Sequence, residues 1–218
     1  WHAWNIVVSK KDEMPAWDLR REFMDSLMHT ALLMPSAIRD VFTFVGTNAL
    51  HQIRLHVDAN YEDVLEGDPS ASEPQPRPLT RRQKESRLAK LAKPLPGASA
   101  FLDFVRQLDG TDYRDETKDY RNANSHAIGP RIALGSTRRV TRRAVPATRM
   151  EIQPDGTGRI VEIPGKYVAS YTFGGLEPLD LEVARMANLQ QYRVARACLG
   201  EFTAIVEANA STLPRADA

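Results

Sequence analysis

A stripe of apolar residues from Ala37 to about Leu65 is the longest regular pattern in the chain. Its members mostly recur at the three- and four-residue spacings of an amphipathic helix: Ile38, Val41, Phe42, Val45, Ala49, Ile53, Val57, Tyr61 and Val64. A helix of this length exceeds the usual globular mean, and its apolar face needs other long helices to cover it. The stripe therefore predicts a helical bundle.

Shorter patterns predict the other helices of the bundle. They cover Pro15–Met34, a basic helix from the capping box at Thr80–Gln83 to about Ala92, Ala98–Leu108, and a closing helix over 177–209. Pro35 is expected to end or kink the first of them, because proline removes a helical hydrogen bond, and Ser36 can cap the next helix. Residues 1–8 are aromatic and β-branched, and predict a short strand or the tail of a truncated element.

Between residues 137 and 174 the sequence pattern changes from helical spacing to the two-residue alternation of β-strands. Extended segments are predicted at Thr137–Val145, Thr148–Gln153, Arg159–Ile163 and Tyr167–Phe173, with a hairpin turn at Pro154–Gly158. Alternation over Tyr167–Phe173 predicts a half-buried strand, in a small antiparallel sheet of two or three strands. The predicted fold class is mainly α: a bundle of long helices with a small antiparallel β-meander inserted before the last helix.

Composition is consistent with one soluble, cytoplasmic domain over residues 1–218, with a Pro- and Ser-rich flexible loop at 66–79. The net charge of +1 gives no global argument for nucleic-acid binding, so any such argument must come from local patches. A single cysteine, Cys198, excludes an internal disulfide and is typical of a reducing compartment. No apolar run is long enough for a membrane span, and the start at Trp1 predicts that more chain precedes it.

Thr111–Pro130 is predicted to form one helix that ends at Gly129 and Pro130. Its last turns hold a compact polar cluster: Arg121, Asn122, Asn124, Ser125 and His126. Asn122 and His126 share a face, whereas Arg121 and His126 lie about 140° apart around an ideal helix axis. One copy of this helix therefore does not bring the arginine and the histidine together.

Arginine and histidine are the side chains that RNA cleavage without metal requires. A neutral imidazole can take the proton of a ribose 2′-hydroxyl, because its pKa lies near neutral pH. A guanidinium can hold the scissile phosphate and neutralise the charge that builds on its oxygens. The alternative is a solvated helix end, since an Arg followed closely by a His is expected by chance in a chain rich in arginine.

The segment RNANSH, residues 121–126, resembles the signature of the HEPN superfamily, in which an Arg, often followed by Asn, precedes a His by several residues. Here Arg121 and His126 have four residues between them. HEPN domains are helical bundles with this motif near the end of a late helix, and the resemblance covers about 15–130 and 177–209 without the β insertion. In HEPN toxins that are paired with minimal nucleotidyltransferases, a Tyr that becomes modified follows two places after the His, where this chain has Ile128.

The resemblance implies a metal-independent endoribonuclease without a cofactor, with a composite cleft at a homodimer interface. His126 would be the general base or acid, Arg121 the phosphate binder and Asn122 the polar residue that follows it. Family members often act in defence or toxin systems, which implies an RNA substrate and a further partner such as an antitoxin. The competing hypothesis is a non-catalytic helical domain for dimerisation or partner binding.

A basic run follows the motif and is the strongest local positive charge. It consists of Arg131, Arg138, Arg139, Arg142, Arg143 and Arg149. Strand alternation places Arg139 and Arg143 on one side, with Arg138 and Arg142 on the other. The run predicts either a solvated edge strand protected by charge or an RNA-binding track that leads to the cleft. His51 and His56, five positions apart, have poor spacing for a metal pair, and His29 and Cys198 are interpreted as structural.

Overall fold

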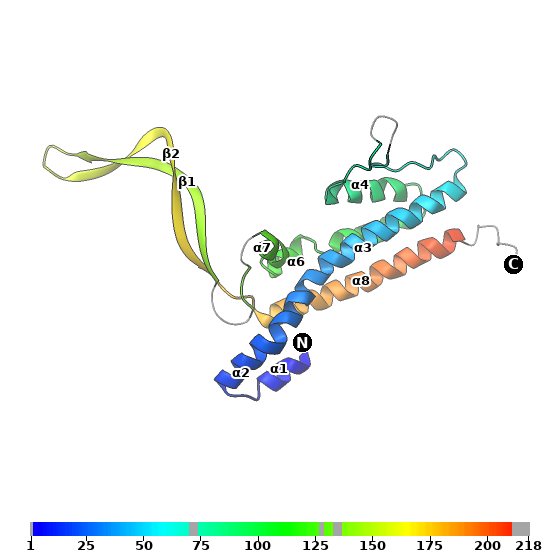
Figure 1. Cartoon of the computed structure of the whole chain (residues 1–218), viewed down its shortest axis with the longest axis horizontal. Coiled ribbons are helices and arrows are strands. Elements are labelled where there is room, and N and C mark those ends of the chain that lie inside the picture. The colour runs from blue at the N-terminus through cyan, green and yellow to red at the C-terminus, as the bar shows by residue number, and fades with distance from the viewer. Residues whose placement is uncertain (1, 70–73, 127–128, 133–136, 211–218) are drawn as a thin grey trace.

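The computed structural model describes residues 2–69, 74–126, 129–132 and 137–210, except for the side chains of residues 126, 139 and 210. Two long helices, α3 (Asp25–Val57) and α8 (Leu181–Ala210), pack side by side along the helical body. A β-hairpin projects away from one end of this body as a long arm (Figure 1). The predicted class, mainly helical with an antiparallel sheet just before the final long helix, is confirmed.

The N-terminal segment is helical. It forms α1 (His2–Val8), α2 (Glu13–Leu19) and a π-helical segment, η1 (Arg20–Met24), which leads directly into α3. Of the two alternatives predicted for residues 1–8, the short strand is therefore wrong over residues 2–8. Trp4 of α1 stacks on Phe23 with ring centroids 5.1 Å apart, and Val8 is buried beside Met24 and Met28. Packing against the start of α3 overrides the β propensity of this segment.

Pro35 lies inside α3 and does not end it, so the two helices predicted on either side of this proline form one helix. An internal proline costs roughly 3 kcal/mol through its missing hydrogen bond and its steric clash. Burial on both sides offsets this cost, because Pro35, Ser36 and Leu32 are all enclosed. The helix ends at Val57, earlier than the apolar stripe indicates, although Tyr61 and Leu65 still pack on the core from the following coil.

Two shorter helices, α4 (Arg81–Ala92) and α5 (Ala98–Gln107), complete the main core against α3 and α8. The predicted capping box is present: the Gln83 N–H donates to Thr80 Oγ1 and the Thr80 N–H donates to Gln83 Oε1 at 2.9 Å. Four helices contribute buried side chains to this core: Leu50, Leu88, Leu91, Phe101, Val105, Val194, Cys198 and Ile205. In the predicted loop 66–79, the described residues form neither helix nor strand, and the Arg77 N–H closes it on the Gly67 carbonyl at 3.0 Å.

The hairpin consists of β1 (Thr137–Ile152) and β2 (Gly158–Leu176), paired antiparallel. β1 continues past Pro146, where the sequence predicts an interruption, and the register shifts between Pro146 and Thr148. Asp155 in the turn accepts from the Thr157 N–H at 2.9 Å. Tyr167, Tyr171 and Phe173 are exposed, so the prediction of a half-buried strand is wrong. β1 and β2 pair with each other, and these three aromatic rings remain exposed on the arm.

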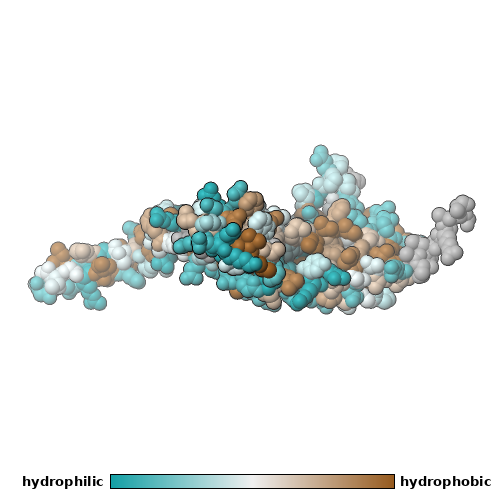
Figure 2. Space-filling model, turned by 90° about the horizontal axis from the view of Figure 1, so that it is seen from below, coloured by the Kyte–Doolittle hydropathy of each residue, from teal (hydrophilic) through white to brown (hydrophobic). Residues whose placement is uncertain are grey.

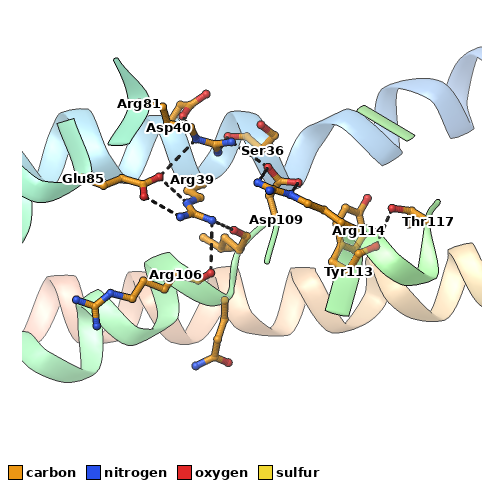
Figure 3. A network of polar contacts seen from close by, with 12 residues as sticks. Ser36, Arg39, Asp40, Arg81, Glu85, Arg106, Asp109, Tyr113, Arg114 and Thr117 are labelled. Carbon is orange, nitrogen blue, oxygen red and sulfur yellow. Dashed lines mark hydrogen bonds and ion pairs between the residues drawn. The ribbon is translucent and has the colours of Figure 1, made fainter. Parts of the chain in front are cut away.

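A network of ion pairs joins α3, α4 and the segment that follows α5 (Figure 3). Arg39 donates to both carboxylate oxygens of Glu85 at 2.8 Å and to the Leu108 carbonyl at 3.0 Å. Asp109 accepts from Arg81 at 2.9 Å and from Arg114 at 3.1 Å. The network sets the path of the chain as it leaves α5 and enters the segment that carries the candidate motif.

Candidate functional site

The motif lies on a short helix. The single helix predicted for Thr111–Pro130 is divided into α6 (Thr111–Glu116) and α7 (Tyr120–His126) by a turn at 117–119. Lys118 and Asp119 adopt left-handed backbone angles in this turn, with φ of 52° and 48°. The predicted helix is therefore wrong in its continuity.

Buried anchors before and after the turn offset its strain. Left-handed residues other than glycine cost of order 1–3 kcal/mol each. Tyr113 is buried and donates its hydroxyl hydrogen to the Leu32 carbonyl at 2.9 Å, while Thr117 Oγ1 donates to the Tyr113 carbonyl at 2.7 Å. Tyr120 is buried as well, with its hydroxyl 3.0 Å from His29 Nδ1. Both tyrosines thus attach this segment to α3.

The exposed face of α7 is polar. Asn122 and Ser125 are exposed and Arg121 is half-buried, whereas Asn124 turns back and donates Nδ2–H to the Tyr120 carbonyl at 2.8 Å. The His126 side chain lies outside the described part of the chain. On a helix, positions 121 and 126 are about 140° apart and flank the exposed Asn122 and Ser125. Residues 121 and 126 both lie within the helix α7, and that they form half of a site stays a prediction.

An open pocket with a volume of about 280 Å³ adjoins the first residue of α7. Three arginines contribute to its lining, Arg20 and Arg21 from η1 and Arg131 from the segment after α7. Asp25 and Tyr120 also line it. The Arg131 carbonyl accepts from the Leu179 N–H at 2.8 Å, which fixes this segment against the start of α8. The surplus of positive charge makes the pocket suitable for an anion such as a phosphate.

The titratable groups of the pocket respond to burial and to one another. Partial desolvation raises the pKa of Asp25, and the positive charges of Arg131 and Arg21 oppose this shift. Burial also raises the pKa of Tyr120, with a further contribution from the negative charge of Asp25. Tyr120 therefore remains a neutral phenol at physiological pH and can exchange a hydrogen bond with His29.

The predicted RNA-binding arginines divide into two groups. Arg131 joins the pocket beside α7, whereas Arg138, Arg142 and Arg143 are exposed along β1 on the projecting arm. The Arg139 side chain is outside the described set. The strand register confirms the predicted alternation, since residues 138 and 142 share one face and residue 143 lies on the other.

Sequence reasoning missed the η1 and α3 side of the pocket. Arg21, Asp25 and His29 are spaced four residues apart, a spacing that predicts neighbours on a helix surface. That signal was present, but nothing in the sequence indicated that Tyr120 would close the other side of the same pocket. Tyr120 reaches the pocket because α7 packs against α3 in the folded chain.

The remaining candidates have structural partners. His51 is buried, with Nδ1 2.8 Å from the Tyr61 hydroxyl and Nε2 2.8 Å from Asp63. Cys198 is buried in the core, as the sequence predicted, and burial raises the pKa of its thiol to about 12. Within the described ranges, no cluster of three or more His, Cys, Asp or Glu residues could hold a metal ion. Within the same ranges, no helix is long and apolar enough to cross a membrane.

Comparisons with protein-family models, with curated protein sequences and with solved structures find no significant match to this chain.

Proposed function

We propose that the protein is a metal-independent endoribonuclease whose cleft is completed by α7 of a second copy. The observation that supports this most directly is the exposed polar surface of α7, which carries Asn122 and Ser125 between the positions of Arg121 and His126. Because those two positions diverge by about 140°, Arg121 of one copy works beside His126 of the other in the proposed dimer.

The proposed reaction needs only protein side chains and the ribose itself. The imidazole of His126 takes the proton of the 2′-hydroxyl, and the 2′-oxygen attacks the adjacent phosphorus. The bond from phosphorus to the 5′-oxygen breaks, and an imidazolium returns a proton to this leaving oxygen. Arg121 stabilises the charge on the phosphoryl oxygens and Asn122 orients the reacting groups. The products are a 2′,3′-cyclic phosphate and a 5′-hydroxyl.

The pocket beside α7 extends the same surface. Arg20, Arg21 and Arg131 can hold a phosphate next to the scissile one, because guanidinium groups bind phosphate with paired hydrogen bonds. Tyr120 belongs to both features, since it begins α7 and lines the pocket. In this proposal, RNA crosses the pocket and then reaches the exposed face of α7.

The decisive experiment is cleavage of total RNA in the presence of EDTA. Wild type should release fragments with 2′,3′-cyclic phosphate ends, and His126→Ala should lower the rate by about 10²–10⁴-fold. Arg121→Ala should lower it by about 10²–10³-fold, as for the loss of one group that stabilises charge in the transition state. Arg193→Ala, which removes an exposed arginine of α8, is the control and should retain the wild-type rate. Full activity in either motif variant would rule out the proposed site.

A second candidate function is assembly without catalysis, favoured by an apolar stripe on α3. Leu27, Met34 and Val41 are seven residues apart and exposed, and Phe44 continues the stripe. On a straight helix these residues lie roughly opposite the buried face that contains Leu32 and Leu50. A seven-residue apolar repeat is typical of a helix that pairs with another helix, and here we propose a second copy.

Molar mass measured by light scattering tests this second candidate. A dimer held by the stripe should become monomeric when Met34 or Val41 is replaced by Glu, while Asn122→Glu on α7 should leave it intact. A dimer held by α7 should give the reverse pattern, because the stripe and the α7 contact lie on different sides of α3. A wild-type monomer at high concentration would contradict both assemblies.

A further inference from the structure

The two faces of the arm differ near its base. Directly paired residues of an antiparallel ladder point to the same face, so Arg142 lies beside Tyr171 and Val140 beside Phe173. Tyr167, opposite Pro146, continues this row, which we call the aromatic face. Its rings are exposed: 82 % of Phe173, 67 % of Tyr167 and 60 % of Tyr171 is accessible.

The opposite face carries no aromatic residue in these paired segments. There Thr141 pairs with Thr172, Arg143 with Ser170 and Val145 with Val168. Aromatic rings are therefore confined to one side of the ribbon, although arginines lie on both. Hydrophobic and hydrophilic residues share the visible surface of the arm (Figure 2), which extends away from the helical body.

Charge identifies the kind of partner that fits the aromatic face. The paired segments 137–146 and 167–176 contain four arginines and neither Asp nor Glu. Two copies of so positive a surface repel one another when they meet face to face, whereas a polyanion is attracted. The acidic residues of the arm, such as Glu151 and Glu162, belong to its distal half.

The spacing of the rings favours a single-stranded over a double-stranded nucleic acid as the ligand. Tyr171 and Phe173 are two residues apart on β2, a separation of about 6.8 Å, which allows each ring to stack on its own unpaired base. Arg138 and Arg142 on the same face can meet the phosphates between those bases. Bases inside a duplex are already stacked and paired, so they do not offer their faces to these rings.

We propose that the aromatic face of the arm binds single-stranded RNA, with Tyr171 and Phe173 stacking on bases and Arg142 contacting phosphate. The ligand class rests on the proposed ribonuclease function. The arm leaves the helical body beside α7, so RNA held on the aromatic face can extend towards the motif helix (Figure 1). The arm thereby selects unpaired RNA before cleavage.

The test is fluorescence anisotropy of the full chain with a labelled 2′-O-methyl oligoribonucleotide, which has no free 2′-hydroxyl and cannot be cleaved. The single strand should bind more tightly than the same strand annealed to its complement. Phe173→Ala and Tyr171→Ala should each weaken single-strand binding by about 5- to 100-fold, the usual effect of losing one stacking ring. Equal binding of single strand and duplex would overturn the proposal.

Matched variants on the opposite face distinguish stacking from general charge attraction. Thr172→Ala and Ser170→Ala should change single-strand affinity much less than Phe173→Ala and Tyr171→Ala, and equal effects on both faces would overturn the proposal. Loss of a dimer in Phe173→Ala with unchanged RNA affinity would assign the face to protein contact instead. Binding that persists without any RNA cleavage by wild type would refute the proposed nuclease while leaving the arm's role intact. Normal cleavage with no contribution of the aromatic rings to binding would refute only the arm's role.

Discussion

Single residues of this chain were predictable from sequence where their environment is local. Cys198 falls on the apolar stripe of the closing helix and is buried there, and Thr80 and Gln83 form the capping box that their spacing indicates. His29 was not predictable in the same way. Its partner, Tyr120, lies 91 residues away in the sequence, and no local sequence pattern indicates a contact between residues so far apart.

The Cys198 thiol is expected to be inert in the native protein. It is fully buried, and burial raises its pKa to about 12, so little thiolate exists near neutral pH. An aromatic disulfide reagent at mildly alkaline pH should leave the folded chain unlabelled and should label one thiol per chain after denaturation. In Leu199→Cys, the new thiol at the neighbouring exposed position should react without denaturant. Rapid native labelling of wild type would contradict the burial of Cys198.

Asp25 is expected to make the wild type less stable as the pH rises. Its pKa in the folded protein is raised by desolvation, so between the unfolded and the folded pKa the native state holds more protons. Stability therefore decreases as pH rises through that window. The Asn side chain of Asp25→Asn is uncharged at every pH. The unfolding free energy of this variant minus that of wild type should therefore increase from about pH 4 to pH 7. Urea unfolding at several pH values measures this difference, and a constant or declining difference would refute it.

Apart from the N-terminal segment, helices and strands were predicted well in type and less well in continuity. The long apolar stripe, the hairpin turn and the alternation along β1 are local patterns, and the structure contains the corresponding elements. At Pro35 and at the turn at 117–119, the structure differs from the local prediction. A proline that predicts a break lies within a continuous helix, and a segment that predicts a continuous helix is broken. In both cases, buried tertiary contacts outweigh the local preference.

The connection between α5 and α6 depends on Asp109. Its carboxylate is only 2 % exposed and accepts from Arg81 of α4 and Arg114 of α6, while its N–H donates to Gln191 of α8 at 2.8 Å. Asp109→Ala leaves two arginines without this partner and should lower the unfolding free energy by about 3 kcal/mol.

Asp103→Ala provides the control for Asp109. Asp103 pairs with Arg106 at 2.9 Å, but both side chains are 61 % exposed. Exposed pairs contribute little, so this variant should lose less than about 1 kcal/mol in the same urea titration. Equal losses in the two variants would show that burial does not determine the contribution of Asp109.

At the scale of the whole molecule, the arm and the helical body are expected to be separable. β1 and β2 pair over most of their length, and the arm returns to its starting point at the pair Thr137 and Leu176. Opposed Cα atoms in an antiparallel ladder lie about 4.5–5.5 Å apart, a gap that a two-residue turn such as Asn-Gly can close. Replacing residues 138–175 by Asn-Gly should therefore preserve the fold of the helical body.

The shortened chain tests how the two parts divide the proposed function. Its thermal midpoint should stay within about 5 °C of wild type, since the change removes little of the helical core. Its affinity for the single-stranded probe should drop at least as far as in Phe173→Ala, because the aromatic face is gone. Cleavage at saturating RNA should persist, since α7 and the pocket arginines remain. Collapse of the thermal midpoint would instead make the arm part of the folding unit, and RNA binding at wild-type strength would place recognition on the helical body.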